Sequence, residues 1–205
     1  MDAIAYVDGF NLYYGALKGT KAKWLDLQAL AIALAPKPLV VRKIRYFTAK
    51  VKPAPRSPSA HMDQQAYLDA LRAHCPLIEI HYGDFLRHKV RMESANPPPA
   101  TVEVFKTEEK GSDVNLAVHL LNDAWAGQAQ AAILISNDSD LAEAVRLAQA
   151  QGMPVYWFPP TLNNGRYPSV ELKKVTAFQR GMYPNVLGRC QLPNPVGNIS
   201  KPTGW

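Results

Sequence analysis

The chain has 205 residues, 47% of them hydrophobic and 20% charged, which suits one domain of ordinary size and excludes a chain that is disordered throughout. No apolar run reaches the roughly 18 residues of a membrane span, and the start MDAIAYVDGF lacks the basic region of a secretory signal. We therefore expect neither a membrane protein nor a secreted one. The two cysteines, Cys75 and Cys190, lie far apart, which excludes a disulfide scaffold or zinc ribbon and favours a reducing, cytoplasmic setting.

Positive charge is concentrated in two stretches of the chain, whose formal net charge is +6. No acidic residue occurs between Leu27 and Met62, whereas seven basic ones do: Lys37, Arg42, Lys43, Arg45, Lys50, Lys52 and Arg56. A second cluster follows at Arg87, His88, Lys89 and Arg91. Such stretches bind phosphates through their charge or form an ordinary solvated surface, and composition does not choose between the two.

The first half of the chain alternates between apolar segments typical of strands and amphipathic segments typical of helices. We predict strands over residues 3–7, 39–49 and 77–82, the last stopped by Gly83. Helices are predicted over residues 27–34, where Asp26 is the N-cap, and over 59–74. Three prolines make residues 52–58 a loop.

The second half continues this alternation after one irregular segment. Residues 85–106 flank a proline triplet and predict a hairpin or another excursion from the main sheet. Ser112 is placed to cap a helix with one apolar stripe, made of Val114, Ala117, Val118, Leu121, Ala124 and Trp125. Strands over 131–135 and 153–158 enclose a helix over 141–148.

This order of elements predicts an α/β fold, because strands that are apolar on both faces form a parallel sheet covered by helices on both sides. We expect one domain over residues 1–182. Residues 183–205 are rich in proline and glycine without periodicity, so we expect a tail there.

Acidic side chains follow two of the predicted strands and open one helix. Asp8 ends the first strand and precedes Asn11, Asp138 and Asp140 follow the strand over 131–135, and Asp113 lies in the first turn of the Ser112 helix. Each alone fits a cap or a turn. Brought together at the carboxyl edge of the sheet, each pair would repel by about 4 kcal/mol at 4 Å, and a divalent cation would remove that repulsion. Oxygen ligands favour Mg²⁺ or Mn²⁺.

Four other functions of α/β proteins are disfavoured by missing motifs. GxGxxG does not follow the first strand, and neither GxxxxGK[ST] nor GxSxG occurs. These absences argue against dinucleotide binding, a P-loop NTPase and an α/β-hydrolase. The first strand ends in Asp8-Gly9-Phe10, without the Asp-x-Asp of an aspartyl-phosphate phosphatase.

Three motifs together resemble a known family. VDGFN at 7–11, EKGSDVNLA at 109–117 and SNDSDL at 136–141 are similar, in order and spacing, to the motifs of the NYN domain in its LabA/DUF88 branch. The resemblance covers roughly residues 1–180. It implies a PIN-like, Rossmann-like three-layer sandwich with a mainly parallel sheet of about five strands, and a metal-dependent ribonuclease acting on single-stranded or structured RNA.

The resemblance also implies which residues form the site. The acidic positions map onto Asp8, Asp113, Asp138 and Asp140, which would bind Mg²⁺ or Mn²⁺ directly or through water, with Asn11 as their polar partner. Basic residues near the expected active-site edge are candidates for guiding RNA, namely Lys50, Lys52, Arg56 and Lys110. For Lys110 a salt bridge with Glu108 or Glu109 is an equal alternative, and a solvated face is favoured for both glutamates. Helix capping is favoured for Ser136, and core packing for Phe10.

Three other functions stay open at this stage. The chain could be a non-catalytic RNA-binding or regulatory module that keeps the acidic pocket, or a DNA nuclease of the FLAP type, because the same acids serve either sugar. It could also be an interaction protein whose proline-rich tail docks a partner. A homodimer is possible, since dimers are common among small α/β nucleases.

Overall fold

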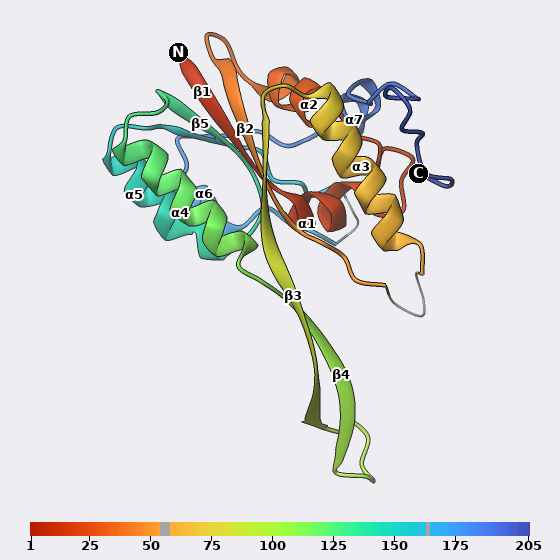
Figure 1. Cartoon of the computed structure of the whole chain (residues 1–205). Coiled ribbons are helices and arrows are strands. Elements are labelled where there is room, and N and C mark those ends of the chain that lie inside the picture. The colour runs from red at the N-terminus through yellow and green to blue at the C-terminus, as the bar shows by residue number, and fades with distance from the viewer. Residues whose placement is uncertain (54–57, 163–164) are drawn as a thin grey trace.

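The computed structural model describes residues 1–53, 58–162 and 165–205, and its centre is a seven-stranded sheet (Figure 1). The strands are β1 (Asp2–Asp8), β2 (Val40–Ala49), β3 (Ile78–Glu93), β4 (Thr101–Lys110), β5 (Ala131–Ile135), β6 (Val155–Trp157) and β7 (Phe178–Gln179). Their order is β4-β3-β2-β1-β5-β6-β7, and every pair is parallel except β3–β4. The predicted α/β class is confirmed. The expected number of about five strands is wrong, because an antiparallel strand and a two-residue strand extend the two ends.

Helices cover both faces of the sheet, which makes the three layers. One face carries α2 (Leu27–Leu34), α3 (Ala60–His74) and α7 (Pro184–Arg189), and the other carries α4 (Ser112–Trp125), α5 (Ala142–Ala150) and α6 (Val170–Val175) (Figure 1). The central strand β1 alternates between two cores: Ala3, Ala5 and Val7 belong to the first and Ile4 and Tyr6 to the second. Because both of its faces are buried, β1 is a rigid base for whatever follows its last residue.

The helix caps agree with the sequence in one case and differ in another. Asp26 caps α2 as predicted, its Oδ1 accepting hydrogen bonds from the backbone nitrogens of Gln28 and Ala29 at 2.9 and 2.8 Å. The N-cap of α4 is Gly111, with a φ of 95°, instead of Ser112. A glycine adopts this left-handed conformation without steric cost, which frees the Ser112 side chain for another contact.

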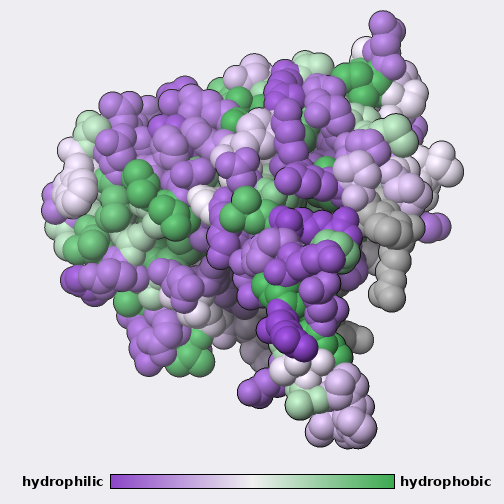
Figure 2. Space-filling model, turned by 60° about the horizontal axis from the view of Figure 1, so that its bottom comes forward, coloured by the Kyte–Doolittle hydropathy of each residue, from purple (hydrophilic) through white to green (hydrophobic). Residues whose placement is uncertain are grey.

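The buried face of α4 matches the predicted stripe only in part: Ala124 is buried, and Ala117 and Leu121 pack against the core as predicted. Leu116, Leu120 and Ala124 pack against the sheet, whereas Val114 and Val118 of the predicted stripe are more than half exposed. Both sets recur at helical spacing, so periodicity alone could not select the inner one. Apolar side chains consequently remain on the surface over this helical layer (Figure 2).

Strands β3 and β4 form a long hairpin that leaves the body of the molecule (Figure 1). The predicted hairpin is confirmed, but Gly83 does not stop the strand as predicted, because β3 runs on through it to Glu93. A Cβ at position 83 would stand 2.6 Å from the Lys110 carbonyl oxygen. Glycine therefore serves here to let the chain at Lys110 pass close by.

The C-terminal segment, which we predicted to be a tail, lies against the α2–α3 layer. Leu187, Leu192 and Val196 are buried in the first core, and the indole nitrogen of Trp24 donates to the Pro193 carbonyl oxygen at 2.9 Å. The domain boundary after residue 182 stays a prediction. Among the described residues, no helix has the length and apolar character that crossing a membrane requires.

Candidate active site

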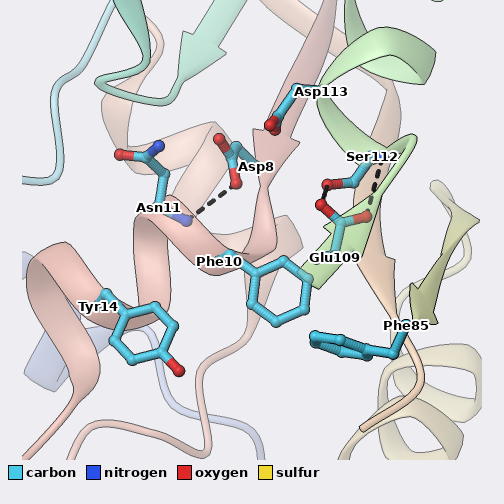
Figure 3. A pocket seen from close by; sticks show the side chains of 8 residues that line it. All are labelled: Asp8, Phe10, Asn11, Tyr14, Phe85, Glu109, Ser112 and Asp113. Atoms are coloured by element: carbon cyan, nitrogen blue, oxygen red, sulfur yellow. Dashed lines mark hydrogen bonds between the residues drawn. The ribbon is translucent and has the colours of Figure 1, made fainter. Parts of the chain in front are cut away.

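A pocket of about 260 Å³ opens where the carboxyl end of β1 meets the start of α4 and the root of the hairpin (Figure 3). Eight residues line it: Asp8, Phe10, Asn11, Tyr14, Phe85, Glu109, Ser112 and Asp113. Three of the five acidic and amide residues predicted from the sequence are therefore in one pocket, at the sheet edge where open α/β folds place their sites.

Asp8 is the buried carboxylate at the base of this pocket. Its Oδ1 accepts a hydrogen bond from the Asn11 backbone nitrogen at 2.9 Å, and its Oδ2 accepts one from the Ser136 hydroxyl at 2.8 Å. Burial raises the pKa of Asp8, and the bonds from Asn11 and Ser136 oppose that shift. Ser136 thus bonds a carboxylate instead of acting only as the helix cap that we favoured.

Asp113 faces Asp8 from the first turn of α4 (Figure 3). Partial burial and the negative charges of Asp8, Asp138 and Glu109 raise the pKa of the Asp113 carboxyl to about 7. Such a shift is what neighbouring carboxylates produce when no cation lies between them. Asp138 therefore lies close enough to the two pocket aspartates for its charge to act on Asp113.

Asp138 and Asp140 lie in the turn after β5, and only the first is close to the pocket acids. Asp138 is half-buried, and its Oδ1 accepts from the Asp140 backbone nitrogen at 3.0 Å, which caps the 3-10 turn Ser139–Leu141. Asp140 is exposed and does not line the pocket. Of the four predicted acids, Asp8, Asp113 and Asp138 are therefore neighbours, and Asp140 lies apart from them.

Asn137, which the sequence did not single out, holds the rim of the site. Its backbone nitrogen donates to Asn11 Oδ1 at 3.1 Å, and its side chain bonds the backbones of Tyr167 and Ser169. Asn11 is thereby tied to the loop after β5 as well as to Asp8. Its position inside the SNDSDL motif was the only sequence signal for Asn137.

Glu109 is a pocket residue that the sequence placed on a solvated face. Both of its carboxylate oxygens accept from Ser112, from the backbone nitrogen at 3.0 Å and from the hydroxyl at 2.7 Å. Glu108, its neighbour, points to the other face of the hairpin and pairs with Lys110, whose Nζ lies 3.3 Å from Oε2. Of the two alternatives predicted for Lys110, a phosphate contact and a salt bridge, the structure shows the salt bridge.

Three rings form an aromatic cluster beside the carboxylates: Phe10, Tyr14 and Phe85 (Figure 3). Phe10 and Phe85 meet edge to face, with ring centroids 5.5 Å apart. Phe10 is half-buried and lines the pocket, so the expected core packing is wrong. Phe85 was missed because only the fold of the hairpin brings it here.

The predicted basic residues are not gathered in one place. Lys52 donates from Nζ to the Phe85 carbonyl oxygen at 2.7 Å and so fixes the hairpin root beside the pocket. Lys50 lies over the Tyr82 ring, with Nζ 5.4 Å from its centroid, and lines a separate hollow with His61 and Gln64. Arg56 lies outside the described residues.

The donor chemistry fits a hydrated hard cation. In the parts of the chain that the structure describes, no three Asp, Glu, His or Cys side chains form a group able to enclose a metal by themselves. Mg²⁺ does not require one, because it keeps several waters and commonly uses one or two carboxylates. The neighbouring charges around Asp113 are those that such an ion would neutralise, and all donors in the pocket are oxygens.

Comparisons with known proteins identify one matching family, one relative in sequence and one similar structure. The family model for the NYN domain matches residues 3–170. The 6-hydroxy-3-succinoylpyridine 3-monooxygenase HspA of Pseudomonas putida is 32% identical over 98% of this chain and 74% of its own length. A crystal structure of a protein of unknown function from Vibrio parahaemolyticus superposes with a TM-score of 0.54 at 16% identity, over 89% of this chain and 94% of that one. The last likeness supports the fold alone.

Proposed function

Because the chain belongs to the NYN domain family, a PIN-like family, we propose that it hydrolyses RNA phosphodiester bonds as a Mg²⁺- or Mn²⁺-dependent ribonuclease. The observation that carries the proposal is that Asp8 and Asp113 line one open pocket at the end of the central strand. Burial, together with the negative charges of Asp8, Asp138 and Glu109, raises the pKa of Asp113 to about 7, so a cation between these carboxylates would be favoured. A fold that needed these residues only as caps would gain nothing from placing them together. The finer assignment to the LabA branch stays a prediction.

Each carboxylate has a distinct task in this proposal. Asp8, held from both sides by Asn11 and Ser136, would be the fixed ligand, and Asp113 would be the second. Asp138 and Asp140 would act through water. The chemistry that Mg²⁺ or Mn²⁺ supplies at such a site is a water of lowered pKa and a positive charge beside the phosphoryl oxygens. Asn11, fixed by the Asn137 backbone, orients Asp8 and contacts the scissile phosphate.

Guidance of the RNA backbone falls to lysines around the pocket rather than in it. Lys52 is placed best, because it lies at the hairpin root next to Phe85. Lys50, which lies over the Tyr82 ring, is a second candidate, and the role of Arg56 stays a prediction. Lys110 should contribute less, because Glu108 already neutralises it. The homodimer stays a prediction, and the two buried free thiols of Cys75 and Cys190 support the proposed cytoplasmic setting.

The test is cleavage of labelled single-stranded RNA and of single-stranded DNA of the same sequence, with Mg²⁺ or Mn²⁺ and with EDTA. We expect RNA cleavage that EDTA abolishes and that Asp8→Asn lowers at least about 100-fold, since the change removes a charge without changing shape. Asp69→Asn on α3 is the matched control, a partly exposed aspartate whose salt bridge with Arg72 contributes little. Equal cleavage by wild type and Asp8→Asn would refute this site.

Two alternatives to a ribonuclease have distinct outcomes in that test. Cleavage of DNA in preference to RNA would indicate the FLAP-type nuclease. RNA binding with no cleavage under any metal condition would indicate the non-catalytic module.

A second candidate function is oxygenation of a small aromatic compound. It has two observations in its favour, the relationship to HspA and the three rings that line the pocket. Carboxylates supply no electrons, so this reaction would also need a separate reductant. Consumption of 6-hydroxy-3-succinoylpyridine with oxygen and a reduced nicotinamide, insensitive to EDTA and without RNA cleavage, would place this candidate first.

A further inference from the structure

The proposed hydrolysis uses the carboxylates of the pocket and leaves its aromatic cluster unexplained. Phe10 and Phe85 are only half-buried, although phenylalanine rings are usually covered. Tyr14 is 45% exposed, with Lys18 Nζ 5.0 Å from its ring centroid. All three line the same pocket as Asp8 and Asp113. Figure 3 shows the rings together on one side of the pocket and the two aspartates on the other.

The rings are held in place from different parts of the chain. Phe10 and Tyr14 follow Asp8 directly, in α1 (Gly9–Leu12) and the π-helical turn Tyr13–Leu17. Phe85 comes from the hairpin root, where Lys52 binds its carbonyl oxygen at 2.7 Å and Glu109 pairs with it across the ladder. Phe10 and Phe85 meet edge to face, and both line the pocket.

Flat ring surfaces beside an acidic centre suit a nucleobase better than a phosphate. Bases stack on aromatic side chains without regard to sequence, because each base has a π-face. A base inside a duplex has both faces covered by its neighbours, so only an unpaired base can reach these rings. The pocket that the three rings line is open and has a volume of about 260 Å³, so its rings are accessible to a flat ligand.

We propose that Phe10, Tyr14 and Phe85 form a subsite for one unpaired nucleobase next to the bond that is cut, with Phe85 as its specificity-determining residue. The choice of a nucleic acid as ligand rests on the proposed nuclease function. The subsite restricts cleavage to single-stranded or bulged positions. It also gives the hairpin a role, since the hairpin delivers Phe85 to the pocket.

The test combines an altered protein with an altered substrate. A set of otherwise identical single-stranded RNAs carries one abasic ribose at successive positions, and cleavage is mapped for wild type and Phe85→Leu. We expect wild type to lose about 10-fold in cleavage when the abasic position adjoins the cut bond. Phe85→Leu should lose about 10-fold on intact RNA and almost nothing more on the abasic one. Phe85→Trp should restore the difference, because it restores a stacking ring.

Two controls separate stacking from folding and from general effects of the hairpin. Phe105→Leu changes a phenylalanine of the same hairpin that is 59% exposed and lies outside the pocket, so it should behave like wild type. Thermal melting of each variant verifies that the fold is intact. Equal losses on intact and abasic RNA for Phe85→Leu would overturn the subsite.

The outcome for the subsite is distinguishable from the outcome for the nuclease. Fluorescence anisotropy with the Asp8→Asn protein measures binding of intact and abasic RNA without cleavage. Weaker binding of the abasic RNA supports the subsite even if wild type cuts nothing. Cleavage that depends on Asp8 but ignores the abasic position, together with equal binding of both RNAs, overturns the subsite and leaves the nuclease intact.

Discussion

Two walls of different construction enclose the pocket. The strand-end wall consists of Asp8 and Asn11, which line the pocket, and of Ser136 and Asp138 behind them. These four residues lie at or after the ends of the central strands β1 and β5. The hairpin wall consists of Phe85, Glu109, Ser112 and Asp113, which follow the ladder β3–β4 and open α4. The first stands on strands buried on both faces, and the second hangs on a ribbon that leaves the domain (Figure 1).

The two walls meet different requirements of the site, one for a fixed carboxylate and one for adaptation to a ligand. A fixed carboxylate such as Asp8 needs a base that does not move, and β1 provides it through parallel pairing with both β2 and β5. The hairpin wall can change without disturbing the core, because most of its ladder lies outside the domain body (Figure 1). We infer that the strand-end wall holds the fixed carboxylate, and that the hairpin wall adds Asp113 and adapts the site to its ligand.

The largest effects should come from the glycine beneath each wall. A Cβ on Gly9 would stand 2.8 Å from the Phe47 carbonyl oxygen, inside the core. Gly9→Ala should therefore lower the free energy of unfolding by about 1 to 3 kcal/mol, as overpacking does. A Cβ on Gly83 meets the chain at Lys110 and Ser112, so Gly83→Ala should reduce cleavage at least 10-fold while costing less stability.

Urea unfolding and RNA cleavage of both variants measure this contrast. Gly181→Ala is the control, because no atom lies within 4 Å of its Cβ position. If Gly83→Ala destabilised the protein as much as Gly9→Ala, the hairpin wall would be part of the cooperative core and the comparison would fail.

Ser136→Ala, in the strand-end wall, should lower both stability and cleavage, by less than the glycine substitutions. The hydroxyl donates to Asp8 Oδ2 at 2.8 Å and accepts from the Asp138 backbone nitrogen at 3.1 Å. Its removal leaves buried polar groups without a partner, which should cost about 1 to 2 kcal/mol of stability and lower cleavage about 10-fold. Ser139→Ala, an exposed serine on the other side of Asp138, should leave both quantities unchanged.

The strand-end wall was the predictable one. Asp8 and Asp138 each follow a short apolar segment directly, and the rule that parallel strands end at a common edge places them together without knowledge of any long-range contact. The apolar segments around them also predicted the α/β fold. Asp140 shows the limit of this reasoning, because it follows Asp138 by only two residues in the same turn and yet is exposed and does not line the pocket.

Apart from Asp113, the hairpin wall could not be predicted, because it depends on the register of an antiparallel ladder. Phe85 opposes Glu109, and Leu86 opposes Glu108. A slip by one residue would have turned Glu108 and Leu86 toward the pocket instead. Nothing local fixes that register, since the segment between the strands has no standard two-residue turn. For the same reason the sequence placed Glu108 and Glu109 on one solvated face.

The smallest effect has the opposite sign and concerns Asp113 of the hairpin wall. The pKa of its carboxyl is about 7 in the folded protein, above its value near 4 in an unfolded chain. The folded state thus holds the proton more tightly, and stability is lost as the pH rises from about 4 through 7. In EDTA at pH 8, Asp113→Asn should therefore raise the free energy of unfolding by about 1 kcal/mol, a modest value because the group is only half-buried.

Two further measurements decide what this gain means. At pH 4 the gain should vanish, because wild-type Asp113 is then protonated as well. Mg²⁺ should stabilise the wild type more than the variant, because an ion that binds only the folded state adds stability by mass action. A gain that persists at pH 4 would arise from packing rather than charge. Equal stabilisation of both proteins by Mg²⁺ would mean that Asp113 holds no cation and that the strand-end wall binds it alone.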